Sequence, residues 1–154
     1  MKNEVTWQSY NVSERVSSFA IFFLHKSSID VLRETVVRDL QLNDFFSRSI
    51  DHLTKNLEYY PRGITYKHVV NNLKGILTAA IVCNDEVRLN VYSALFFQEL
   101  AIIVGEDGML REGSSHYQFI VTRWICEIEY LFMKAKYKDG SEKIAKYSRS
   151  MLAG

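Results

Sequence analysis

The stretch Val69-Val70-Asn71-Asn72-Leu73-Lys74-Gly75-Ile76-Leu77-Thr78-Ala79-Ala80 decides the fold class of this chain. Its apolar residues Val69, Leu73, Ile76 and Ala80 recur at steps of three and four, the period of an α-helix. The segments 29–40, 46–57 and 120–132 repeat this spacing. Nowhere do apolar and polar residues alternate long enough to indicate a strand. The sequence therefore predicts an all-α protein.

The same pattern places the individual helices. We expect them near residues 12–25, 28–40, 43–59, 65–83, 86–104, 115–136 and 141–151, with Ser13, Ser28 and Ser115 as N-caps. The linkers between them are short, which predicts stacked antiparallel hairpins. One proline and seven glycines are few for a β-rich domain, and we expect the glycines where helices stop.

Composition limits the class of protein. The chain has 154 residues, of which 47% are hydrophobic and 24% charged, which is typical of a single globular domain covering residues 1–154. Nineteen basic and 18 acidic residues leave a formal charge of +1. Nucleic-acid binding requires a basic surface, so we expect no nucleic-acid partner.

The remaining residue-type signals concern redox chemistry and membranes. Cys83 and Cys126 lie in apolar helical stretches with no second ligand at metal-binding spacing, so we expect two buried thiols and no metal. The longest apolar run, Phe19–Leu24, is too short to span a membrane. The first residues are polar and lack a signal-peptide pattern. This favours the cytoplasm if Met1 is the natural start, while a longer parent protein would be compatible with the periplasm.

The segment from Val91 to Val104 is apolar on more than one face, with Leu95, Phe96, Leu100 and Ile102 among its residues. Such a helix requires cover on both sides. This pattern fits a segment of a larger helical array, and it favours self-association through exposed apolar helix faces.

The densest polar segment runs from Asp107 to Gln118. Ser115 and Gln118 have the spacing of a capping box, which places Tyr117 in the first turn of a helix. The positive end of the helix dipole favours negative charge there, which suits a tyrosine acting as a base. The alternative is that Tyr117 packs on a neighbouring helix while Arg111 and Glu112 are solvated.

A second polar cluster comprises Lys67, His68, Asn71 and Asn72. His68 and Asn72 are four residues apart and share a helix face. Together with Lys67 they are suited to neutralise a carboxylate, although a solvated helix face has the same pattern. The acidic pairs Glu127 with Glu129 and Asp85 with Glu86 lack the neighbours expected of a glycosidase acid and base, so we interpret them as surface charges.

Motifs of the common enzyme classes are missing from the sequence. It has no glycine-rich phosphate loop, nucleophile elbow, His-Glu-x-x-His zinc motif or calcium loop. Conventional kinase and hydrolase functions therefore have no support, and we expect no cofactor. The aromatic content of 13% is compatible with a sugar-stacking cleft or with an aromatic core.

Four short motifs, in this order, resemble the helical domain of heparinase II/III-like polysaccharide lyases. The segment Trp7-Gln8-Ser9-Tyr10-Asn11-Val12-Ser13-Glu14-Arg15 is similar to the family's W-x-x-Y-x-x-S-E-R, and Asn56-Leu57-Glu58-Tyr59 follows it. His68 with Asn72-Leu73-Lys74-Gly75 is similar to N-H-x-x-x-N-x-(K/R)-(A/G). Residues 107–117 are similar to D-G-x-x-x-E-x-S-x-x-Y. The resemblance covers roughly residues 7–135.

The resemblance implies an incomplete α/α toroid and cleavage of uronic-acid polysaccharides by β-elimination. It also implies that Tyr117 and His68 are catalytic residues, and that Lys67, Asn72, Glu112 and His116 are candidates for substrate binding. The expected ligand is an acidic, uronate-containing polysaccharide, and this chemistry requires no redox cofactor.

Two departures from the family pattern stand out. Lys67 occupies the position of the family's asparagine, which binds the uronate carboxylate. The β-sandwich domain that closes the cleft in this family is absent from residues 1–154, so we expect a fragment with little activity by itself. The alternative function is a non-catalytic helical scaffold or interaction module derived from such a lyase. If the first hypothesis is correct, Tyr117, His68 and Lys67 share one concave surface. The scaffold function predicts instead that these side chains diverge, or that a core contact explains each of them.

Overall fold

The computed structural model describes residues 8–26, 40–59 and 67–153, and all its regular elements are α-helices. They are α1 (Ser9–Lys26), α3 (Leu40–Lys55), α4 (Lys67–Val82), α5 (Glu86–Ile103), α6 (Ser115–Lys134) and α7 (Lys138–Ala153). An isolated bridge between Val104 and Leu110 is the only β-type pairing in this part of the chain. The predicted all-α class is therefore confirmed. None of the helices described is long and apolar enough to cross a bilayer.

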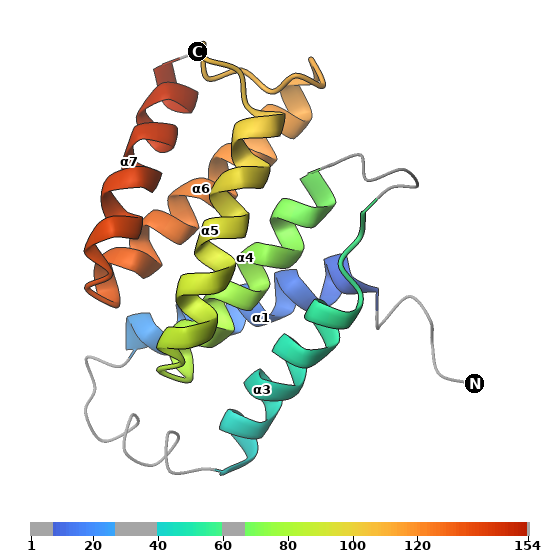
Figure 1. Cartoon of the computed structure of the whole chain (residues 1–154), viewed down its shortest axis with the longest axis vertical. Coiled ribbons are helices and arrows are strands. Elements are labelled where there is room, and N and C mark those ends of the chain that lie inside the picture. The colour runs from blue at the N-terminus through green and yellow to red at the C-terminus, as the bar shows by residue number, and fades with distance from the viewer. Residues whose placement is uncertain (1–7, 27–39, 60–66, 154) are drawn as a thin grey trace.

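Helix α4 is the central element (Figure 1). It packs against α1, α3, α5 and α6, while α7 packs against α6. Short turns join α4 to α5 and α6 to α7, as expected for helical hairpins. Every residue of α4 from Val69 to Ile81 is buried, so this helix has no solvent-facing side along most of its length.

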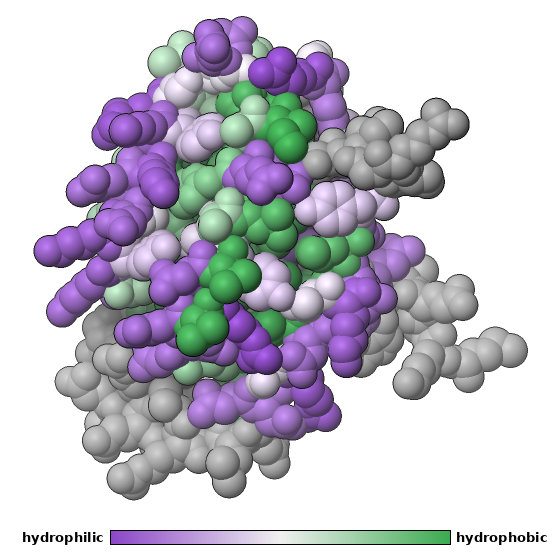
Figure 2. All heavy atoms as spheres, viewed as in Figure 1, coloured by the Kyte–Doolittle hydropathy of each residue, from purple (hydrophilic) through white to green (hydrophobic). Residues whose placement is uncertain are grey.

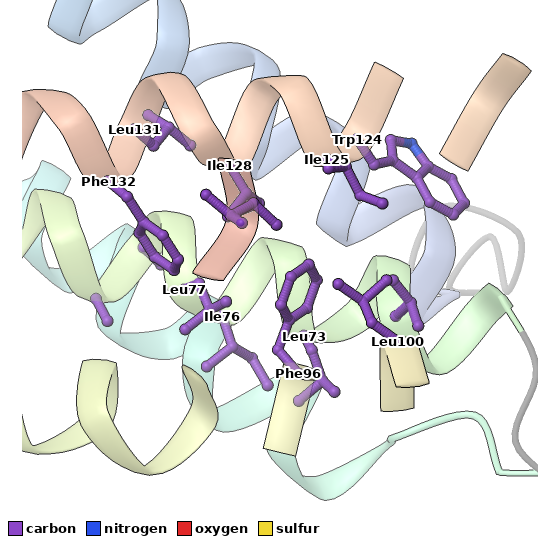
Figure 3. Close-up of a cluster of buried hydrophobic side chains, with 14 of the residues drawn as sticks. Leu73, Ile76, Leu77, Phe96, Leu100, Trp124, Ile125, Ile128, Leu131 and Phe132 are labelled. Carbon is purple, nitrogen blue, oxygen red and sulfur yellow. The ribbon is translucent and has the colours of Figure 1, made fainter. Parts of the chain in front are cut away.

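The main core fills the space between three helices (Figure 3). Leu73, Ile76 and Leu77 come from α4, and Phe96 and Leu100 from α5. The opposite side is formed by residues of α6, namely Trp124, Ile125, Ile128, Leu131 and Phe132. Burial of this apolar area is the main driving force that brings the three helices together.

Among the described residues, helix α5 is covered on one side only. It buries Phe96 and Leu100 but leaves Val87 and Val91 exposed, with 74% and 59% of their surface accessible. Figure 2 shows apolar side chains gathered along α5, next to the polar side chains of α7. The predicted second apolar face of this helix is thus present.

Several helices begin or end three or four residues from the positions expected, because local spacing does not report tertiary contacts. Helix α1 begins at Ser9 rather than near residue 12, and Ser13 is not an N-cap, since its hydroxyl donates to the Asn71 carbonyl of α4. Helix α3 spans Leu40–Lys55 instead of 43–59, and α7 begins at Lys138 instead of residue 141. The predicted helix 28–40 and the cap Ser28 lie outside the described residues.

The start of α6 also differs from the prediction. Ser114, not Ser115, is the N-cap, and its side chain accepts from the Tyr117 N–H. Gln118 forms no capping box. Its amide instead accepts from Leu110 N at 2.8 Å and donates to the Gly108 carbonyl at 3.0 Å, which fastens the preceding loop to α6.

Gly75 lies inside α4, contrary to the expectation that glycines mark helix ends. It faces α1 at the place where the two helices cross: a methyl group on Gly75 would lie 2.6 Å from Ser13 Oγ and 2.9 Å from Ser13 Cα. Asn71 strengthens this crossing, because its Nδ2 donates to the Tyr10 carbonyl at 3.2 Å. A small residue is required here because the backbones approach so closely.

Lys74 places a charge in the centre of the helical assembly. Its side chain is completely buried, and its Nζ lies 2.9 Å from Glu14 Oε1 of α1 and 3.1 Å from Glu127 Oε2 of α6. Arg123 contacts the same two carboxylates, at 2.8 Å from Glu14 and 3.4 Å from Glu127. We call Glu14, Lys74, Arg123 and Glu127 the buried ion cluster. It corrects the interpretation of Glu127 as a surface charge.

We expect Gly75→Ala to lower the free energy of unfolding by about 1–3 kcal/mol, because the added methyl group overlaps Ser13. An uncrowded glycine inside a helix gives the opposite sign, since replacement by alanine stabilises by about 0.5–1 kcal/mol. Urea unfolding followed by circular dichroism measures the difference. A stabilised variant would contradict the close crossing of α1 and α4.

We expect Lys74→Met to lower the free energy of unfolding by about 1–3 kcal/mol, because it removes the buried cation between two carboxylates and leaves the more exposed Arg123 as their shared partner. Lys146→Met, on the exposed side of α7, is the matched control and is expected to change stability by less than about 0.5 kcal/mol. Thermal unfolding of both variants is the measurement. Equal effects would show that the buried ion cluster does not hold the helices together.

Candidate functional site

One open pocket of about 370 Å³ collects most of the predicted site residues. Its walls come from the first turns of α1, α4 and α6 together with the chain that follows α3. The lining residues are Gln8, Tyr10, Glu58, Lys67, His68, His116, Tyr117, Ile120 and Trp124. Four of the six predicted residues, Lys67, His68, His116 and Tyr117, therefore face the same hollow.

Lys67 is the cation of this pocket. Only 11% of its side chain is exposed, and its Nζ lies 2.8 Å from Glu112 Oε2. The same Nζ lies 3.5 Å from the centre of the Tyr117 ring, a cation–π contact. The ammonium group thus joins α4 to α6 and to the loop that carries Glu112.

Tyr117 lies three residues after the N-cap of α6, as the sequence predicted for the first helical turn. About 36% of its surface is exposed. Its hydroxyl forms no hydrogen bond with any residue in the described part of the chain, and the His116 ring is centred 5.5 Å away. The phenol is held through its ring and backbone, which leaves its oxygen accessible to a ligand.

His68 lines the pocket from the first turn of α4. Its side chain is 47% exposed, and its Nδ1 is 3.9 Å from Glu58 Oε2. The Tyr10 ring is centred 5.4 Å from the imidazole. The partly exposed imidazole therefore lies beside a carboxylate and an aromatic ring, a position from which an imidazole can act in proton transfer.

Asn72 was predicted to bind substrate, but it lies outside the pocket lining. It is fully buried and does not line the pocket, so it has no surface with which to bind a substrate directly. Its Oδ1 accepts from Glu58 N at 3.0 Å and its Nδ2 donates to Glu58 Oε2 at 3.1 Å. Asn72 therefore fixes Glu58, which in turn faces His68.

Glu58 is the charged residue of the pocket lining for which the sequence predicted no role in the site. It follows α3 at a position for which the sequence predicted the end of a helix, and the segment Asn56-Leu57-Glu58-Tyr59 contains no separate catalytic signal. The adjacent Tyr59 hydroxyl donates to Glu99 Oε1 at 2.8 Å, and burial together with this bond raises the pKa of Tyr59 to about 12. Tyr59 consequently remains neutral and ties the segment to α5.

Two aromatic rings form the inner wall of the pocket. Tyr10 and Trp124 meet edge to face with centroids 6.0 Å apart, and Trp124 is completely buried. Burial raises the pKa of Tyr10, and the Glu14 carboxylate adds to the effect, so Tyr10 stays protonated and acts as a contact surface. Within the described residues, the Trp124 indole N–H has no acceptor.

The cysteines lie away from this pocket. Cys83 and Cys126 are both free, and both are partly buried, whereas the sequence predicted buried thiols. Burial, with help from neighbouring carboxylates, raises the pKa of each thiol, which disfavours the reactive thiolate. In the segments that the structure describes, no group of three or more His, Cys, Asp or Glu side chains is arranged to hold a metal ion.

The pocket therefore combines a buried ammonium group, two accessible imidazoles, an accessible phenol and an aromatic wall. Such a set is suited to bind an anionic, ring-shaped ligand and to move a proton on it. Comparisons of the chain with protein-family models, with curated proteins and with solved structures find no match. The functional assignment accordingly depends on the geometry of the pocket and on the residues that line it.

Proposed function

We propose that this chain is the helical catalytic part of a polysaccharide lyase, that it forms part of an incomplete α/α toroid, and that it acts on uronate-containing glycans. The observation that carries the proposal is the shared pocket of Tyr117, His68 and Lys67, which come from segments about 50 residues apart in the chain. The order of the four motifs in the sequence agrees with it.

The residue types match the requirements of β-elimination. The proton on the carbon next to a uronate carboxylate becomes removable only when the charge of that carboxylate is balanced. Lys67 supplies a cation that is held in place by the Tyr117 ring, and His68 supplies a second donor across the pocket. The pocket volume of about 370 Å³ accommodates a sugar ring, which the wall formed by Tyr10 and Trp124 contacts.

The proposed reaction balances without a cofactor. Tyr117, as phenolate, takes the proton from the carbon that bears the carboxylate, and the electron pair passes into the carboxylate as an enolate held by Lys67. The enolate then collapses to a carbon–carbon double bond, and the glycosidic bond to the leaving sugar oxygen breaks. The Tyr117 hydroxyl returns its proton to that oxygen, which restores the phenolate.

We expect Tyr117→Phe to reduce product formation at least about 100-fold, because phenylalanine keeps the ring over Lys67 but has no proton-transferring oxygen. The assay follows the ultraviolet absorbance of the unsaturated product during incubation with a panel of uronate polymers, using this chain and any longer natural form of it. Tyr130→Phe, on α6 outside the pocket, is the matched control and is expected to retain activity.

Two results would contradict the lyase proposal. One is full activity of Tyr117→Phe, which would exclude the phenol as the proton-transferring group. The other is the absence of both binding and product across the whole panel for every length of chain. The second result would favour the scaffold function.

The exposed face of α5 supports an alternative function as an interaction module that self-associates. Val87, Val91 and Ile102 are all exposed on this helix. In that case we expect Val91→Glu to shift the chain toward monomer in sedimentation velocity, because it places a charge in an apolar contact. Glu86→Gln, at the start of the same helix, serves as the control, and a monomeric wild type would exclude this alternative.

A further inference from the structure

The geometry points to Glu112 as a built-in competitor for the anion site on Lys67: we infer that its carboxylate lowers the affinity of the pocket for anionic ligands and thereby determines which ligands are retained. This inference rests on the proposed function, since it concerns the same pocket. It assigns to Glu112 the opposite effect from the substrate-binding role expected from the sequence.

The contact between the two residues is asymmetric. Lys67 has 11% of its side chain exposed and is held on a second side by the Tyr117 ring at 3.5 Å. Glu112 is more exposed, and Lys67 is its only interaction partner among the described residues. The cation is thus fixed, whereas the carboxylate is free to turn toward solvent without loss of another contact.

The backbone around Glu112 is fastened independently of its side chain. Arg111 N donates to the Ile103 carbonyl at 3.0 Å, and Gly113 N donates to the Leu110 carbonyl at 3.0 Å. Gln118 holds Leu110 from α6. Release of the Glu112 carboxylate therefore requires only rotation about its side-chain bonds, and the loop keeps its shape.

The charges around the pocket explain the consequence for ligands. One fixed ammonium, that of Lys67, is paired with the Glu112 carboxylate, and a second carboxylate, that of Glu58, lies in the same pocket beside His68. A neutral sugar has no charged group that could replace Glu112 on Lys67. Its binding therefore leaves the ion pair between Lys67 and Glu112 intact. A ligand carboxylate replaces Glu112 on the Lys67 ammonium group or shares that group with it. The negative charge of Glu112 reduces the attraction between the ligand carboxylate and Lys67. Only an anionic ligand can therefore displace Glu112 from Lys67, and Glu112 lowers the affinity of the pocket for such a ligand.

The test compares the wild type with Glu112→Gln, which keeps the shape of the side chain and removes its charge. Acetate serves as the carboxylate alone, trigalacturonate as the uronate oligosaccharide, and the methyl ester of trigalacturonate as the neutral form. Binding is measured by NMR titration and by calorimetry. We expect Glu112→Gln to bind acetate and trigalacturonate about fivefold more tightly and to leave the affinity for the methyl ester unchanged.

Three variants serve as controls. Glu106→Gln removes an exposed carboxylate from the same loop and is expected to leave all affinities unchanged. Lys67→Met is expected to abolish the preference for the charged ligands. Glu112→Ala is expected to change acetate affinity in the same direction as Glu112→Gln, which separates the effect of charge from that of side-chain shape.

Weaker or unchanged acetate binding by Glu112→Gln, or no acetate binding by any form, would overturn the inference about Glu112. Failure of the glycan proposal looks different. If acetate affinity rises in Glu112→Gln while trigalacturonate and other uronate oligomers bind to no form, the competitor role stands and the glycan is not the ligand.

Discussion

The packing of α1 and α6 against α4 depends on the buried ammonium group of Lys74, which pairs with a carboxylate from each of the two helices. A completely buried charge is tolerated only when opposite charges reach it, and here Glu14 comes from α1 while Glu127 comes from α6. Arg123 closes the cluster on its outer side. Because Lys74 requires both carboxylates, α1 has to turn the side that carries Glu14 toward α4, and α6 has to turn the side that carries Glu127 toward it.

The pocket is built on the same helix faces as the buried ion cluster. Tyr10 precedes Glu14 by four residues, and Lys67 precedes Lys74 by seven, so each pair lies on one side of its helix, one or two turns apart. Ile120 and Glu127 are related in the same way on α6. Trp124 connects the two layers, because it lines the pocket and its ring is centred 5.3 Å from Lys74 Nζ. The arrangement that satisfies the buried charges thus also brings the pocket side chains together.

The helical period was enough to predict the fold class and the approximate positions of the helices that the structure describes, because apolar spacing reflects burial directly. It did not predict which polar residues are buried. Ser13 looks like an N-cap in the sequence, but its hydroxyl is used across a helix crossing. Gly75 looks like a helix end, yet it is required where two backbones meet. Such contacts join residues about 60 positions apart, and local spacing carries no information about them.

The sequence also predicted some of the residues that line the pocket, because these residues lie at the end of a buried helix. Helix α4 is buried on all sides, so a charged residue within it requires partners from its neighbours, and the polar residues at its first turn lie where this helix emerges at the surface. Lys67 and His68 occupy that position, between an apolar interior and solvent. Charges at such a boundary are screened less than those on an open surface, which strengthens their attraction for a ligand. The prediction failed for Asn72, which was expected to bind substrate, and for Glu58, for which no role in the site was expected. The sequence does not reveal that the Asn72 amide, one turn further into the helix, contacts Glu58 rather than the pocket.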